Sequence, residues 1–436
     1  MMNFFKKNVL FIIIILGVIL RFILLFPDYA FDVNNHIVWA KDLHNYGFNN
    51  FFYKQSSEVY GVKFPNYPPL SLFIFYLIYS LGLIIYKFFW WLNVNIPIFP
   101  SNLMFFFEHK RFLAGLFKIT SILADFGTLY FIYLFIKKIA PKNIKFQLIL
   151  LTLFLFNPII FYNSAFWGQI DIIPIFLVLW SFYMLIYSKK YFISGILFML
   201  SLLVKPTSLV FLPFYFIFFI YKYGWSNFIK TLLVSNILFL FSFAPFLKNP
   251  VDLSSSYKIY FEKIISAQSL SFVSNNAFNF WAIITQFGQI KDTSLFLFNI
   301  SYRFWGYLIM GFFFLFIYYY FLKSKNKINS LYYSLFLCSF VSFLFLTKMH
   351  ERYIILILPF LLIMSIKNHK FIFWFVLISV IGLLNMYRSW PVPKSEYLLL
   401  ILNNYYVYVV LSLSNLIIFS HLFIKFKNNC INNTIN

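Results

Sequence analysis

The chain has 436 residues, of which 62% are hydrophobic and only 11% are charged, against about 25% charged residues in an ordinary soluble domain. Long apolar runs recur from end to end, which excludes a soluble globular protein and predicts an integral membrane protein. The formal net charge of +23 does not indicate nucleic-acid binding, because no basic amphipathic segment or soluble domain is present to carry such a patch.

Apolar segments of helical length divide the chain into about twelve predicted transmembrane helices. They cover residues 8–26, 112–136, 146–165, 171–188, 191–204, 207–222, 229–247, 303–322, 330–347, 353–367, 370–387 and 403–424. The predicted fold is therefore an all-α polytopic membrane protein, with residues 1–436 forming a single membrane-embedded domain.

The lysines predict the orientation of these helices. If the N-terminus is cytoplasmic and the spans alternate, every cytoplasmic loop carries at least two lysines, as the positive-inside pattern requires. All acidic residues except Asp125, which lies within a span, then fall on the opposite side. We therefore expect both termini in the cytoplasm and the chemistry on the outer face of a prokaryotic cell membrane or in the lumen of a eukaryotic endoplasmic reticulum.

The apolar run from Pro68 to Trp91 is the one segment that we do not count as a span. If it crossed the membrane, all later lysine-rich loops would lie outside. We therefore predict that it lies along the outer interface or re-enters it, inside a long first external loop over residues 27–111. A second large external loop is predicted over residues 248–302.

The first external loop begins with two carboxylates and a histidine. Asp28, Asp32 and His36 are spaced four apart, so on a helix they would share one face just above the membrane. A carboxylate there can act as a general base toward a hydroxyl within hydrogen-bond reach. An interfacial helix with a solvated polar face explains the same pattern.

The stretch "WGQID" lies at the outer end of a span. Trp167, Gln169 and Asp171 supply an aromatic ring, an amide and a carboxylate, which suits a sugar. An interfacial tryptophan with a capping aspartate is the structural alternative.

Cations stand at two further span ends. Lys205 precedes a proline between two short apolar segments and can neutralise a phosphate, or extend its amine to the interface. At the end of the ninth span, His350, Glu351 and Arg352 follow Lys348, and arginine offers bidentate geometry to phosphate. The second histidine of a zinc-protease motif is missing, so that class is excluded.

Three ionisable residues lie within predicted spans. Arg21, Lys118 and Asp125 are expected to pair or to mark a pathway, and Lys118 and Asp125 share a helix face seven residues apart. A structural charge network near the cavity is the interpretation we favour.

Taken in order, these stretches form a recognisable series. An early aspartate is followed by Y-P-P, K-x5-A-D, N-P…W-G-Q-x-D, K-P and H-E-R-Y before a proline. The series resembles the polytopic GT-C glycosyltransferases. It is most similar to mannosyltransferases related to the one that adds the second mannose of GPI anchors, and also to the dolichyl-phosphate-glucose-dependent glucosyltransferases. The resemblance covers about residues 20–360, and residues 370–436 carry no motif.

The resemblance implies an inverting transfer of a hexose, mannose in the closest relatives, from a polyprenyl-phosphate donor to a glycan or glycolipid acceptor. It implies Asp32 as the general base, with Asp28 and His36 as possible helpers. It also implies a donor-phosphate site at Lys205, His350 and Arg352, and a sugar or acceptor site at Trp167, Gln169, Asp171 and Glu351. Membrane lipid is the other expected partner. Since the loops lack a D-x-D sequence, no metal site and no firm cofactor are predicted.

A transporter or flippase of a lipid-linked saccharide is the alternative function. Such proteins have broken helices and polar groups near the bilayer midplane, often with an internal repeat. In this sequence the polar groups cluster at outer span ends, which favours the enzyme.

Overall fold

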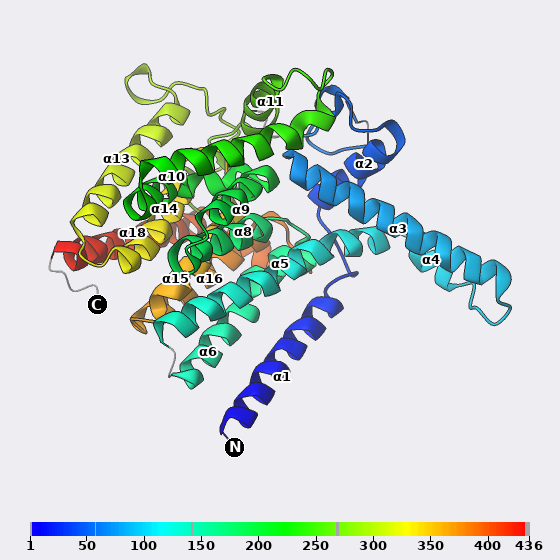
Figure 1. The fold of residues 1–436 in the computed structure, drawn as a ribbon, viewed down its shortest axis with the longest axis horizontal. Helices are drawn as coiled ribbons and strands as arrows, with labels where there is room; N and C mark the ends of the chain where they lie inside the picture. Colours follow the sequence, from blue (N-terminus) through cyan, green and yellow to red (C-terminus); the bar gives the residue numbers. More distant parts are fainter. Residues whose placement is uncertain (1, 57, 141–142, 267–269, 432–436) are drawn as a thin grey trace.

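The computed structural model describes residues 2–56, 58–140, 143–266 and 270–431. These residues are almost entirely helical, and the sheet among them is one short parallel pair, β1 (Ser274–Asn275) and β2 (Met349–His350). The prediction of an all-α polytopic membrane protein is confirmed (Figure 1).

Within the described ranges, eight helices are long and apolar enough to cross a membrane, and three other apolar helices are shorter. The long ones include α3 (Pro69–Asn95), α5 (Lys110–Ile139), α13 (Tyr302–Lys323), α14 (Lys327–Phe345), α16 (Lys370–Ser389) and α18 (Tyr405–Ile431). The other two are composite: α6 (Ile144–Leu155) with α7 (Pro158–Phe161) and η2 (Tyr162–Trp167), and η4 (Pro206–Phe211) with α10 (Leu212–Phe243) and η5 (Ala244–Phe246). The short ones lie in α1 (Met2–Ile23), α8 (Ile172–Tyr183) with η3 (Met184–Ser188), and α9 (Tyr191–Val204).

Three predicted spans deviate from regular helices. The segments 207–222 and 229–247 are joined in α10, which breaks at Gly224, where φ is 78°. The left-handed region favours glycine, so the break falls at the one residue that adopts it without strain. The predicted span 353–367 begins as a 3₁₀ segment, η8 (Glu351–Ile357), and continues as the short α15 (Leu358–Ser365).

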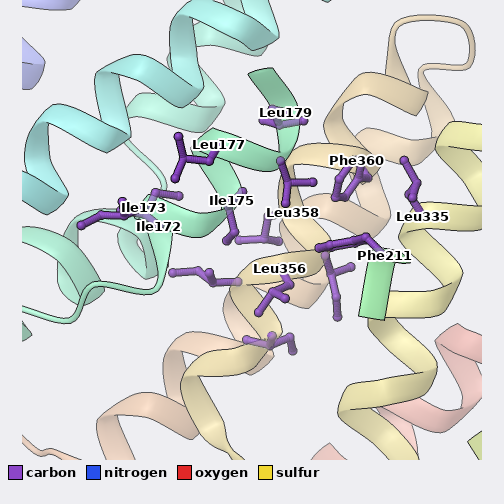
Figure 2. Close-up of a cluster of buried hydrophobic side chains, with 14 of the residues drawn as sticks. Ile172, Ile173, Ile175, Leu177, Leu179, Phe211, Leu335, Leu356, Leu358 and Phe360 are labelled. Carbon is purple, nitrogen blue, oxygen red and sulfur yellow. The ribbon is translucent and has the colours of Figure 1, made fainter. Parts of the chain in front are cut away.

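Apolar side chains fill the space beneath the residues predicted to form the site. Figure 2 shows this cluster, to which α8, η4, α14, η8 and α15 contribute Ile172, Ile173, Ile175, Leu177, Leu179, Phe211, Leu335, Leu356, Leu358 and Phe360. Within a membrane such contacts stabilise by close packing rather than by excluding water. Because Asp171 precedes α8 and Arg352 lies in the first turn of η8, this packing fixes both positions.

The predicted first external loop contains α2 (Phe31–Tyr46), η1 (Phe51–Tyr53), α3 and α4 (Leu103–Glu108). α3 and α4 extend away from the other helices in Figure 1. α3 packs against α2 and α9 as well as α5. Its contacts with α5 fall on the N-terminal half of that helix, where Phe75 lies against Phe117 and Gly82 against Leu113. Lys137 and Lys138 lie at the opposite end of α5. Although α3 is long enough to cross a membrane, its place at the interface remains our prediction.

The predicted second external loop holds α11 (Ser255–Ile259), η6 (Tyr260–Ile265), β1, α12 (Phe280–Thr285) and η7 (Leu297–Asn299), while residues 267–269 lie outside the described part. Arg303 donates two hydrogen bonds, of 2.7 and 2.8 Å, to the carboxylate of Asp292. Thr347, beyond α14, donates to the same carboxylate at 3.3 Å. The loop is thereby attached beside β2. The remaining helix is α17 (Glu396–Asn403).

Candidate active site

The structure separates the two early carboxylates. α2 begins at Phe31, so Asp28 lies before the helix and does not share its face with Asp32; that prediction was wrong. The physical reason is Lys118, whose amine donates hydrogen bonds to the carbonyl oxygens of Leu25, at 2.9 Å, and Asp28. These carbonyls are held in a turn instead of a helix.

Asp32 lies in the first turn of α2, where the helix dipole favours a carboxylate. Its Oδ2 accepts a hydrogen bond from Gln169 Nε2 and lies 3.8 Å from Arg352 Nη2. The Asp32 side chain is 37% exposed, whereas that of Arg352 is only 8% exposed. Asp32 is therefore the carboxylate of this cluster that an incoming hydroxyl can reach.

The turn after η2 places Gln169. Gly168 has φ of 86°, and an added Cβ would lie 2.6 Å from Val33 Cγ2 on α2. Around it, the carbonyl of Trp167 accepts from Ala30 N–H at 3.1 Å, and that of Gln169 accepts from Ser121 Oγ at 2.7 Å. Only glycine permits this close approach, so the W-G-Q sequence fixes the amide against Asp32.

Asp171 and Lys205 form a buried ion pair. Lys205 Nζ donates to Asp171 Oδ1, and both side chains are at most 7% exposed. The Lys205 amine also lies over the rings of Tyr67, at 5.9 Å, and Tyr353, at 5.1 Å. A buried charge is tolerated only when paired, so Lys205 is already neutralised without a ligand.

Arg352 connects the separate motifs. Its Nε lies 3.3 Å from Asp171 Oδ2 and its Nη1 lies 3.4 Å from Glu351 Oε1, in addition to the contact with Asp32. The guanidinium also lies over the ring of Trp167, 5.8 Å from the centroid. The H-E-R-Y and W-G-Q-x-D stretches are thus brought together around one cation.

This cation determines the charge of Asp32. Burial raises the pKa of Asp32, but the Arg352 guanidinium and the hydrogen bond from Gln169 outweigh burial and lower it to about 2. Burial raises the pKa of Glu351, which Arg352 partly offsets. Asp32 is therefore a carboxylate at neutral pH.

The two histidines are neutral at this pH. Burial and the nearby Arg352 lower the pKa of His350 to about 3, so His350 offers a hydrogen bond rather than a charge. Burial also lowers the pKa of His36 to about 3. The His36 ring stacks on Phe75 with centroids 4.2 Å apart, and its buried Nε2 has no hydrogen-bond partner. The predicted helper role of His36 stays a prediction, although its ring points into an aromatic pocket.

Several residues at the site were not predicted from the sequence. Tyr67, Tyr353 and Asn163 contact Lys205 or Asp171, and the first two belong to motifs whose other residues were singled out. Trp390 stacks on Trp167 with centroids 5.5 Å apart and planes at 14°. Trp390 follows α16, in the region that carries no motif, so only its tertiary contact reveals it.

The intramembrane charges form a separate pair. Arg21 Nε donates to Asp125 Oδ2 at 2.7 Å, and Ser164 Oγ donates to the same oxygen at 2.6 Å. The expected charge network therefore exists, but Arg21, not Lys118, is the partner of Asp125. Because Ser164 belongs to η2, this pair supports the segment that carries Trp167.

The acidic side chains of the site surround the guanidinium of Arg352. Among the described residues, no group of three His, Cys, Asp or Glu side chains is placed to hold a metal ion. The arrangement offers one ionised and accessible carboxylate beside buried amide, carboxylate and aromatic groups. This set can accept a proton from a hydroxyl and can hydrogen-bond a polyhydroxylated ring.

A comparison with protein families identifies the family of the chain. The family described as Glycosyltransferase family 87 matches residues 64–347, which is most of the chain. The chain belongs to this family.

No curated protein matches the sequence. The family 87 match includes Tyr67, the W-G-Q-x-D stretch and Lys205, whereas Asp32, His350, Glu351 and Arg352 lie outside it. As a family 87 glycosyltransferase, the protein acts on a sugar donor and an acceptor. The structure adds two carboxylates, Asp32 and Glu351, to the site residues of the matched region.

Proposed function

We propose that the protein transfers a hexose, with mannose as the first candidate, from a polyprenyl-phosphate-linked donor to a glycan or glycolipid acceptor, with inversion. The observation that carries the proposal is Asp32, ionised and partly exposed between Gln169 and Arg352. In this mechanism the acceptor hydroxyl gives its proton to Asp32 while its oxygen attacks the anomeric carbon. The bond from that carbon to the donor phosphate oxygen breaks, and the polyprenyl phosphate leaves with the electron pair.

The side chains around Asp32 would bind the sugars. Trp167 presents an aromatic ring for C–H groups, and Gln169 has a buried Oε1 without a hydrogen-bond partner in the structure. Glu351 Oε2 is likewise buried without a partner. Buried polar atoms are normally satisfied, so these two acceptors fit the hydroxyl donors of a bound sugar.

A lipid-linked donor fits the position of the site. Asp171, Lys205 and Glu351 stand at ends of apolar helices whose opposite ends carry Lys189, Lys190 and Lys327. With lysines inside, the site lies at the extracytoplasmic surface, and both termini are cytoplasmic. Nucleotide sugars are made in the cytoplasm, so a donor anchored in the membrane is the more suitable class.

The phosphate roles predicted for Lys205, His350 and Arg352 remain proposals. Lys205 and Arg352 are each paired with carboxylates, and His350 is uncharged. A donor phosphate would therefore have to displace existing partners of these cations.

The donor class is tested with purified protein in lipid and labelled polyprenyl-phosphate mannose, polyprenyl-phosphate glucose and the matching nucleotide sugars. We expect label to reach a glycolipid acceptor only from a polyprenyl-phosphate sugar. Transfer from a nucleotide sugar without a lipid intermediate would contradict the proposal. A matched reaction with the Asp32→Asn variant controls for contaminating transferases.

A further inference from the structure

Arg388 is a cation beside the site that has no acidic partner. It lies in the last turn of α16, is half-buried, and forms no ion pair with a carboxylate in the described part of the chain. Its Nε is buried without a hydrogen-bond partner, and its Nη1 donates only to the amide oxygen of Asn276, at 3.4 Å. A buried, unpaired guanidinium is costly unless a ligand completes its hydrogen bonds.

The surroundings of Arg388 hold the guanidinium in place. It lies over the ring of Phe287, 4.2 Å from the centroid, and near that of Tyr408 on α18, at 5.5 Å. Asn276 in turn donates to Ser389 Oγ at 3.3 Å. The guanidinium, the amide and the hydroxyl thus form a fixed set of polar groups beside the Glu351 carboxylate, which acts on the guanidinium without forming an ion pair with it. The donors of the guanidinium and the amide fit an anion.

This set adjoins the Asp32 cluster from two directions. Asn276 pairs with the backbone of His350, whose Nδ1 lies 3.5 Å from Arg352 Nη1. On the other side, Trp390 follows Ser389 and stacks on Trp167. Arg388 is therefore separated from Asp32 by His350 and Arg352.

Inversion constrains where the leaving phosphate can lie. In an in-line displacement, the base and the leaving group occupy opposite faces of the sugar, and catalytic groups of inverting glycosidases are about 6.5–9.5 Å apart. Arg352 lies 3.8 Å from Asp32 and so stands on the base side. A cation for the leaving phosphate has to lie farther from Asp32, as Arg388 does.

We propose that Arg388, with Asn276, binds the phosphate of the lipid-linked donor and stabilises it as the leaving group. This inference rests on the proposed function. The acceptor oxygen forms its bond to the anomeric carbon as the carbon–oxygen bond to the phosphate breaks. The proton moves to Asp32, and the electron pair leaves with the phosphate oxygen, where fixed positive charge is most effective.

The test measures binding and does not depend on which sugar is transferred. Purified wild-type, Arg388→Gln and Arg388→Lys proteins are titrated with polyprenyl phosphate and with the uncharged polyprenol. We expect Arg388→Gln to weaken polyprenyl-phosphate binding about 10- to 100-fold, as loss of charged hydrogen bonds implies, and to leave polyprenol binding unchanged. Arg388→Lys should lose less, because a point charge remains.

The controls separate this inference from the proposed function. Lys394→Gln removes an exposed charge from the segment between α16 and α17, and this variant should bind both ligands as the wild type does. If the wild type binds polyprenyl phosphate no better than polyprenol, both proposals are contradicted. If the wild type prefers the phosphate and Arg388→Gln retains that preference, only the role of Arg388 is overturned. A variant that loses polyprenol binding equally would also contradict a phosphate-specific role.

Discussion

The ionisation of Asp32 depends on Arg352, whose Nη2 lies 3.8 Å from the carboxylate. The folded-state pKa of about 2 lies below the ordinary value of 3.8. The contact therefore stabilises the fold above pH 4 or so, and that contribution is lost as the pH falls toward 2. A carboxylate of such low pKa is a weak base in the free enzyme.

We predict that kcat/KM does not fall on the acid side of its pH profile. In the wild type, transfer should show no loss caused by Asp32 between pH 8 and pH 5, because the carboxylate stays ionised. In Arg352→Gln, burial is offset less strongly because only the hydrogen bond from Gln169 remains of the two main lowering effects. The Asp32 pKa therefore rises, and activity should fall at higher pH than in the wild type. A wild-type profile with an acid midpoint above 5 would contradict the low pKa. Size-exclusion chromatography of the variant controls for misfolding.

At the scale of elements, the site depends on how closely the η2 turn approaches α2. The backbone contacts of Trp167 with Ala30 and of Gln169 with Ser121 tie η2 to α2 and α5. The buried pair of Arg21 and Asp125 supports the same segment from α1 through Ser164. The position of one amide thus depends on three helices.

Gly168→Ala tests this arrangement. The methyl group would meet Val33 at 2.6 Å in a left-handed backbone, so we expect a loss of about 1–3 kcal/mol of stability and a larger loss of transfer, because Gln169 moves from Asp32. Gly311→Ala in α13, where a Cβ has open space, should leave both unchanged. Thermal unfolding in detergent and transfer assays measure the two effects. An unchanged melting temperature and transfer rate for Gly168→Ala would contradict the close approach of Gly168 to Val33.

The sequence predicts most of the helices and the ends of the spans, because apolar length and lysine position are local properties. It also identifies Asp32, Gln169, Asp171, Lys205 and Arg352 as candidates. It does not predict that Arg352 lies among three carboxylates, since two of them, Asp32 and Asp171, come from distant segments. For the same reason it misses Trp390 and Arg388, and it places Asp28 on a helix because nothing local reveals that Lys118 holds the turn.

At the scale of the whole molecule, the lysine-rich ends and the site lie at opposite ends of the same helices. Asp171 precedes α8 while Lys189 and Lys190 follow η3, and Lys327 begins α14 while Glu351 lies beyond its end. This separation supports a site that opens away from the cytoplasm. The predicted orientation of the helices assumes that α3 lies at the interface and does not cross the membrane.

Cysteine labelling tests the orientation. Lys63→Cys, in an exposed part of the first predicted external loop, should react with a membrane-impermeant maleimide in intact cells. Lys325→Cys, exposed between α13 and α14, should react only after permeabilisation. The native Cys338 and Cys430 are buried and should give little background. The reverse pattern at Lys63 and Lys325 would overturn the predicted sidedness.

The most direct test of the account is the transfer rate of Asp32→Asn, which keeps the size and a hydrogen-bonding group of the side chain but removes the base. We predict a loss of about 10²–10⁴-fold or more with unchanged expression and melting temperature. Asp28→Asn, four residues earlier and outside α2, should transfer sugar at close to the wild-type rate. Full activity in Asp32→Asn, or loss of activity only in Asp28→Asn, would contradict the assignment of the catalytic base.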